Sequence, residues 1–343
     1  MFTDIIGNDS LKETLARLRT AGRVPNAMLF TGPDGVGKRL FAIEIARSFV
    51  CRVSDYEPCG KCPACVRAGQ FDLPDPDEKE VYKKVIFSHH PDVGTVIAQK
   101  RFILVDAVRD LESEAHFRPY EGRARTFIVD NADKMNPAAS NALLKTLEEP
   151  ASTSRIILVT SRPDSLLATI RSRCQTFRFA PIRTEQVTRF LMETKSMSEP
   201  DARLAAKISE GSVGRAAAVD IAQMRERRHR MLIVLRDALM DRDRVALMRA
   251  SEKMAEAKNK EFFEADLELL LMLVRDVWAI AAGADEAAVV HHDLFHELSG
   301  LASSSDPRKL SHIITEIELI RERFVVNINK KFASDALFLK LAA

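Results

Sequence analysis

The chain has 343 residues, of which 46% are hydrophobic and 6% aromatic, and its 51 basic and 49 acidic residues nearly cancel. This length exceeds one ordinary core and predicts two or three domains, while the balanced charge gives no global field that would indicate a nucleic-acid partner. No run of about 18 apolar residues and no basic-then-apolar N-terminal signal is present, so we expect a soluble, cytoplasmic, helix-rich α/β protein with no membrane partner.

A glycine-rich loop at residues 32–39 follows a short apolar run at 27–31 and precedes an amphipathic helix. Strand, glycine loop and helix is the context of the phosphate-binding pattern G-x-x-x-x-G-K-[ST]. Glycines allow backbone N–H groups to turn around phosphate oxygens, and the lysine adds a positive charge. An ordinary glycine turn is the alternative, which this context disfavours. The candidate nucleotide-binding residues of the loop are Gly32, Gly35, Gly37, Lys38 and Arg39.

Arg39 departs from the pattern, because a serine or threonine is expected after Lys38. That hydroxyl would help to hold the magnesium ion that bridges the β and γ phosphates. Arginine cannot ligate a metal, so the loop has the form of an ATPase site but lacks the hydroxyl that would bind magnesium.

Four of the five cysteines lie within residues 51–65. Tight turns at two-residue spacing aim sulfurs at one point, and four thiolates satisfy a tetrahedral zinc ion, which would then be structural. Redox-active or unliganded thiols are the alternative. His89 and His90 could compete as ligands, but they follow a polar, flexible-looking stretch at 72–84, and we expect them to be strand-edge residues. The predicted zinc ligands are Cys51, Cys59, Cys62 and Cys65.

A second apolar strand at 126–130 ends in Asp130 and is followed by Asn131. Asp130 occupies the position of a magnesium-side aspartate, whereas Asn131 stands where a water-activating glutamate is expected. An amide can orient a water but cannot accept its proton, so this second loss predicts weak or absent hydrolysis. Alternatively, Asp130 caps the following turn.

Further along, a helix starts at Pro137 and carries an apolar stripe, and a third strand at 156–159 leads to Thr160. Polar residues at such strand ends face the nucleotide pocket in open α/β sheets. The triplet Ser172-Arg173-Cys174 follows. By itself it is weak, because arginines near helix ends are usually solvated or bound to carbonyls.

Together these motifs make the chain resemble the delta prime family of bacterial DNA polymerase III clamp-loader subunits, over nearly its whole length. The cysteine segment is shared with the gamma/tau family, but gamma/tau has a threonine and a glutamate where this chain has Arg39 and Asn131, and tau carries a long tail. The segments that carry the resemblance are Ile6-Gly7, 32–39, 51–65, Pro119-Tyr120-Glu121-Gly122, 141–150, 172–174, 211–215 and 327–341.

The resemblance implies an organisation and a set of partners. It places an AAA+ P-loop parallel sheet domain at 1–180 with a zinc module near 51–65, a small helical lid at 181–222, and an all-α collar at 223–343. Apolar stripes including 269–280 and 313–324 would build the collar. The expected partners are the gamma/tau and delta subunits in a hetero-pentamer, the sliding clamp and, through the complex, primed DNA.

The resemblance also implies an activity exerted on a neighbour. Arg173 resembles an arginine finger that acts in trans on the ATP site of a gamma/tau subunit, and Arg215 stands at a second sensor position, or is a surface residue. The chain would help load the clamp during replication as a component of the DNA polymerase III holoenzyme, a DNA-directed DNA polymerase. Its own ATPase would be weak or absent, and the preserved loop leaves ATP binding open.

Two other functions remain open at this point. One is a catalytically active AAA+ ATPase of gamma/tau type that tolerates Arg39. The other is a zinc-dependent DNA-binding module with a vestigial P-loop, although basic and acidic residues are interspersed and give no phosphate-binding stripe.

Overall fold

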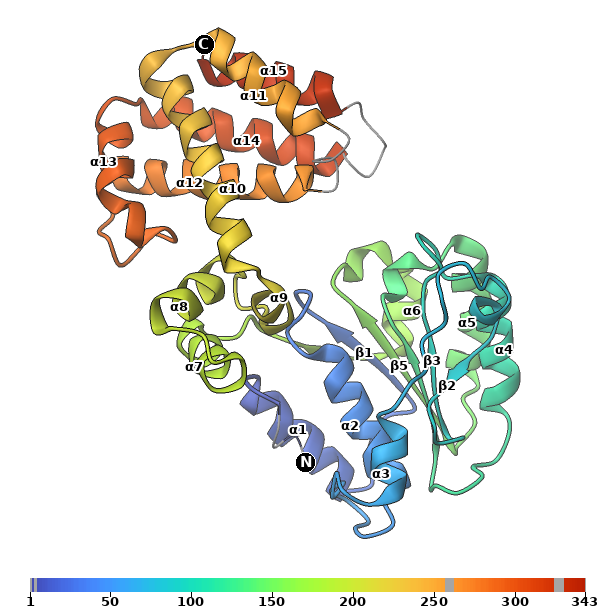
Figure 1. The fold of residues 1–343 in the computed structure, drawn as a ribbon. Helices are drawn as coiled ribbons and strands as arrows, with labels where there is room; N and C mark the ends of the chain where they lie inside the picture. The colour runs from blue at the N-terminus through green and yellow to red at the C-terminus, as the bar shows by residue number, and fades with distance from the viewer. Residues whose placement is uncertain (1, 3–4, 257–261, 324–329, 343) are drawn as a thin grey trace. The chain divides into compact units, whose positions relative to one another are not determined.

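The structure, a computed structural model, describes residues 2, 5–256, 262–323 and 330–342, so Phe324 and the 327–329 part of the C-terminal motif lie outside the described residues. The chain divides into two compact units, Met1–Ala218 and Val219–Ala343 (Figure 1). Within the described part of the chain, no helix has the length and apolar character needed to cross a membrane.

The first unit is built on a six-stranded sheet in the order β2-β3-β4-β5-β1-β6. All neighbouring pairs are parallel except β2 and β3, which are antiparallel. The three strands predicted from apolar runs are confirmed as β1, β4 and β5. The bounds are β1 Ala27–Thr31, β2 Ile86–Phe87, β3 Val93–Val96, β4 Arg125–Val129, β5 Ser154–Thr160 and β6 Gln175–Arg178.

Helices cover both faces of this sheet (Figure 1), because the central strands are apolar on both sides, as expected for parallel strands. Leu29, Phe127 and Leu158 pack with α4 and α5, whereas Phe30, Ile128 and Ile157 pack with α1 and α2. The helices of this unit are α1 Asp9–Thr20, α2 Lys38–Val50, α3 Pro63–Ala68, α4 Val105–Ala115, α5 Pro137–Glu148, α6 Ala168–Arg173, α7 Thr184–Lys195, α8 Glu199–Ile208 and α9 Val213–Ala218, with short 3-10 helices η1 Val81–Lys83, η2 Ala132–Lys134 and η3 Pro163–Ser165.

The second unit is helical throughout its described secondary structure. Its core contains much of the two predicted apolar stripes, but two members of the stripes lie at the surface of this unit: Trp278 is 41% exposed and Leu319 is 38% exposed. The elements are α10 Ile221–Arg236, a π-helical turn Asp237–Asp241, α11 Arg244–Ala255, α12 Phe263–Ala281, η6 His292–Leu294, α13 Phe295–Ser303, α14 Pro307–Arg323 and α15 Lys330–Ala342.

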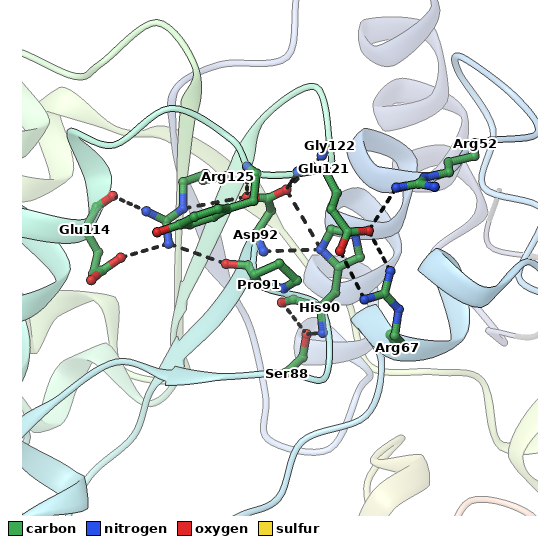
Figure 2. Close-up of polar contacts among 11 residues, drawn as sticks. Arg52, Arg67, Ser88, His90, Pro91, Asp92, Glu114, Glu121, Gly122 and Arg125 are labelled. Atoms are coloured by element: carbon green, nitrogen blue, oxygen red, sulfur yellow. Dashed lines mark hydrogen bonds and ion pairs between the residues drawn. The ribbon is translucent and has the colours of Figure 1, made fainter.

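A buried polar cluster ties the loop at 119–122 to the sheet (Figure 2). Asp92 is fully buried and accepts hydrogen bonds from the backbone N–H groups of Tyr120, Glu121 and Gly122 at 2.7, 2.8 and 2.7 Å. Arg125, 1% exposed, places its Nε 3.9 Å from the Asp92 carboxylate. The Asp92 carboxylate therefore satisfies three backbone donors and lies near a buried guanidinium, which also pairs with Glu114 at 2.8 Å.

The same cluster reaches the cysteine segment through Glu121. The Glu121 carboxylate pairs with Arg52 at 3.0 Å and Arg67 at 2.6 Å (Figure 2). Arg52 directly follows Cys51, and Arg67 lies two residues after Cys65. His90 is fully buried with its Nε2 3.7 Å from Glu121. His89 and His90 lie in the turn between β2 and β3, so their assignment as strand-edge residues was wrong, and η1 interrupts the stretch predicted as a flexible loop.

We predict that Asp92→Ala lowers the free energy of unfolding of the first unit by about 3–5 kcal/mol, because it leaves three buried backbone N–H groups unpaired and removes one of the two carboxylates near the buried Arg125, which keeps its ion pair with Glu114. Urea denaturation followed by circular dichroism measures the change. The matched control is Asp106→Ala, which removes an aspartate that is 53% exposed. Equal midpoints for the two variants would contradict the prediction.

Candidate functional site

The register of the central strands brings the predicted nucleotide-binding residues to one edge of the sheet. Thr31 pairs with Thr160 and Val129 pairs with Leu158 in parallel ladders. The carboxyl ends of β1, β5 and β4 therefore lie side by side, and the glycine loop, Asp130 and Thr160 follow directly from them.

The glycine loop has a conformation that side chains would not tolerate. Gly32, Gly35 and Gly37 have φ values of +141°, +73° and +96°, a region that favours glycine. A Cβ at Gly35 would lie 2.1 Å from the Ser212 Oγ, and one at Gly32 would lie 2.4 Å from the Phe179 carbonyl oxygen. Two of the three glycines thus allow close approach of neighbouring segments as well as the backbone turn.

Lys38 is folded into this loop. It is 5% exposed, and its Nζ donates to the carbonyl oxygens of Gly32 at 2.7 Å and Pro33 at 2.6 Å. Burial lowers the pKa of Lys38, while the carboxylate of Asp34, 3.8 Å away, acts in the opposite direction. Lys38 is the first residue of α2, and its ammonium group lies among carbonyl oxygens of the loop itself.

A cavity of about 650 Å³ opens next to the loop and is large enough for a nucleotide-sized ligand. Its polar side contains the candidate residues Gly35, Gly37, Lys38, Arg39, Asp130 and Thr160, together with Asn131. Its apolar side includes Ile5, Ile6, Ile182, Phe190 and Val213. An apolar wall opposite a phosphate-binding loop can hold a nucleoside base.

Arg39 and Asp130 form an ion pair inside this cavity. The Arg39 Nη1 lies 3.5 Å from the Asp130 Oδ2, with side-chain exposures of 32% and 18%. The Arg39 guanidinium also lies over the Phe71 ring, 5.6 Å from its centroid. The other carboxylate oxygen of Asp130 accepts a hydrogen bond from the adjacent Asn131 N–H at 3.1 Å. Asp130 does not cap the following turn, whose N-cap residue is Asn131.

Asn131 adopts a left-handed backbone conformation, with φ 53° and ψ 53°. Asparagine enters this region several-fold more often than most residues, so the residue at position 131 suits its backbone conformation.

Thr160 is held by two residues that the sequence analysis did not identify. Its Oγ1 donates to the Asp133 Oδ1 at 2.7 Å and accepts from the Arg162 N–H at 3.0 Å, and the Arg162 side chain pairs with Asp133 at 3.5 Å. Their positions just after β4 and β5 are the only sequence signal that could have indicated them. Polar residues at neighbouring parallel strand ends are expected to meet.

Two predicted residues place their side chains elsewhere. Arg215 is exposed at the start of α9, and the cavity is lined instead by its neighbours Val213 and Gly214. Arg173 lies at the end of α6, where its Nη2 pairs with Glu148 at 2.6 Å and its Nη1 donates to the Thr169 carbonyl at 3.0 Å. Arg173 is thus on the surface of this unit, 35% exposed, and its role stays a prediction.

The four clustered cysteines converge as the spacing predicts. The Sγ atoms of Cys51, Cys59, Cys62 and Cys65 all lie within 4.8 Å of one another, and neither His89 nor His90 belongs to this group. Cys62 caps α3 by accepting from the Cys65 N–H, and Pro63 is favoured at the following position.

The pKa values of two cysteines in the cluster, Cys62 and Cys65, shift in opposite directions. Burial would raise the pKa of Cys62, but hydrogen bonds from the backbone N–H groups of Arg52 and Cys65 outweigh it and lower the pKa to about 6. Burial raises the pKa of Cys65. Four adjacent sulfurs cannot all ionise without a cation between them, so the donor set fits a divalent, thiophilic metal.

A protein-family model described as DNA polymerase III, delta subunit, matches residues 7–183. The Bacillus subtilis DNA polymerase III subunit delta′ is 30% identical over 322 residues, which cover 93% of this chain and 91% of that protein. The Escherichia coli subunit delta′ is 30% identical over 96% of this chain and 92% of its own length. The Mycobacterium tuberculosis gamma/tau subunit is 35% identical over only 53% of this chain and 29% of its length.

The matches to delta′ subunits extend over nearly the whole of both proteins, whereas the gamma/tau match is confined to about half of this chain. The sheet order, the glycine loop and the helical second unit agree with the AAA+ fold expected from the sequence. The chain therefore belongs to the delta prime family of DNA polymerase III clamp-loader subunits.

Proposed function

We propose that this chain is a clamp-loader subunit that does not hydrolyse ATP itself and instead acts on the ATP site of a neighbouring gamma/tau subunit. The observation that carries the first part is the Arg39–Asp130 ion pair, which engages the carboxylate that a catalytic magnesium ion would need. Asn131 supports it, because an amide has no basic group to accept a proton from water.

The action on a neighbour is assigned to Arg173. It is held by an ion pair with Glu148, and both side chains are partly exposed, at 35% and 49%. Exposed ion pairs contribute only about 0–1 kcal/mol, so docking against a partner's phosphates can replace this one at little cost. An arginine finger supplied in trans contributes about 10³–10⁵ in rate.

The neighbouring Cys174 has a structural role in this proposal. It is 8% exposed within the sheet core, and burial raises its pKa to about 12. Such a thiol is inert, and it anchors the end of α6 that presents Arg173.

The four-cysteine cluster is proposed to hold a structural zinc ion. Tetrahedral Zn–S bonds of about 2.3 Å place the sulfurs about 3.8 Å apart, which agrees with sulfurs that all lie within 4.8 Å of one another. Zinc would supply the positive charge that stabilises four thiolates and would close the loop between α2 and α3.

The proposed setting is the cytoplasmic replication machinery. The partners are the gamma/tau and delta subunits in a hetero-pentamer, with the sliding clamp and primed DNA reached through that complex. We assign 1–180 to the sheet domain, 181–222 to the lid and 223–343 to the collar in this assembly, and Arg215 to a second sensor position.

We predict that the isolated chain shows no ATP turnover above background in a phosphate-release assay, because metal and base positions are both changed. Lys38→Ala serves as the matched control and should give the same baseline. Turnover that disappears in Lys38→Ala would instead identify an active ATPase.

We predict that Arg173→Ala leaves the reconstituted complex with gamma/tau, delta and clamp intact but lowers its DNA-stimulated ATP hydrolysis. The loss should be partial, since only one of several shared sites loses charge stabilisation. Steady-state ATPase rates at saturating ATP measure it, and size-exclusion chromatography checks assembly.

Arg171→Ala is the control for loss of an arginine, because Arg171 lies on the same helix and pairs with Asp164 at 2.8 Å. Glu148→Ala removes the ion-pair partner of Arg173 but keeps the arginine itself, so it should not lower the ATPase rate of the complex. Equal rates for Arg173→Ala and Arg171→Ala in intact complexes would reject the finger.

We predict about one zinc ion per chain by elemental analysis, and a lower melting temperature for Cys62→Ser, because structural zinc binding is coupled to folding. Cys174→Ser, outside the cluster, should keep the full zinc content. A metal-free protein that melts at the same temperature would contradict the zinc assignment.

A further inference from the structure

The Arg39 guanidinium occupies the place where a phosphate-binding loop normally recruits its metal. Magnesium requires near-octahedral oxygen ligands at about 2.0–2.1 Å, and in such loops it takes one from the hydroxyl after the lysine. Here that position carries Arg39, and the Asp130 carboxylate lies 3.5 Å from the guanidinium. A divalent cation at Asp130 would lose a ligand and stand beside a fixed positive charge, so the site does not fit magnesium.

The remainder of the site keeps the features that bind phosphate. The glycine loop retains its left-handed turns, and Lys38 lies within it. The 13-residue helix α2 starts at the loop, and no side chain caps its N-terminus. The first residues of α2 line the 650 Å³ cavity, so no capping side chain competes with a phosphate for their N–H groups. The chain therefore keeps the groups that bind phosphate but lacks a group that would bind the metal.

Arg39 is suited to replace the missing charge. A guanidinium carries five N–H donors in a planar fork that matches phosphate oxygens in pairs. Arg39 contacts Asp130 through Nη1, and the face of its guanidinium lies over the Phe71 ring. Among the described residues, none accepts a hydrogen bond from its Nε or Nη2. Asp130 and Phe71 thus orient the group while part of its donor fork stays available.

We propose that this site binds a nucleoside polyphosphate without a divalent cation, with Arg39 serving as the counter-charge that magnesium provides in hydrolysing relatives. The inference rests on the proposed non-hydrolysing function and deepens it. A nucleotide held this way would act as a structural ligand of the sheet, loop and α9 region, which meet where the Gly214 N–H donates to the Gly35 carbonyl at 3.0 Å.

The test is isothermal titration calorimetry of ATP with the full chain, in magnesium and in excess EDTA. For the wild type, we expect dissociation constants that agree within about twofold, a difference well below 1 kcal/mol. Arg39→Thr restores the hydroxyl of the loop pattern, so its ATP affinity should fall about tenfold in EDTA and recover in magnesium. Arg101→Thr, at an exposed position outside the cavity, controls for the loss of one positive charge.

Three outcomes would overturn the inference: wild-type affinity that rises tenfold or more with magnesium, an equal magnesium response in wild type and Arg39→Thr, or no ATP binding in either buffer. Lys38→Ala should abolish binding in both buffers and shows that the heat comes from the loop. None of these outcomes bears on the action in trans, which is measured by the ATPase rate of the assembled complex, so failure of the inference is distinguishable from failure of the proposed function.

Discussion

The parallel pairing of β1, β5 and β4 is the constraint on which the site depends. Each ladder aligns the carboxyl ends of its strands, as in the pairing of Thr31 with Thr160. A shift of one residue in either ladder would turn buried side chains toward the opposite face and separate Asp130 from the loop. Because both faces of these strands are packed with helices, the register is fixed by the core, and the position of Arg39 opposite Asp130 follows from it.

The two departures from the ATPase pattern, Arg39 and Asn131, are physically consistent with each other. A guanidinium opposite Asp130 neutralises a carboxylate that would otherwise need a metal, so the pair is stable without one. If no metal is held, as we propose, a base beside Asp130 would have no reaction to support; position 131 carries an asparagine in a left-handed conformation that asparagine tolerates. Gly32 and Gly35 are also required by packing, because a Cβ at either position would lie too close to a neighbouring segment, such as the Ser212 side chain beside Gly35.

Local patterns predicted much of this structure, and tertiary contacts account for what they missed. Apolar runs located β1, β4 and β5, and the cysteine spacing located the sulfur cluster, because these features depend on residues near one another in sequence. The burial of His90, the exposure of Trp278 and the pairing of Arg173 with Glu148 depend on segments that are distant in sequence. Periodicity gives the direction of a side chain on its own element, but it does not identify what covers that side chain.

Helix α2 connects the phosphate loop to the cysteine cluster. α2 begins at Lys38 beside the loop and ends at Val50, next to Cys51. α3, which contains Cys65, packs on α2 through Ala46, Val50, Ala64 and Ala68, and the chain leaving it supplies Phe71 to the face of Arg39. Glu121 joins the same segment to the buried Asp92 cluster through Arg52 and Arg67. A metal that orders the cysteines would therefore also fix the helix that carries Arg39 and the aromatic ring beneath its guanidinium. In this way the proposed zinc ion would stabilise the proposed phosphate site without contacting it.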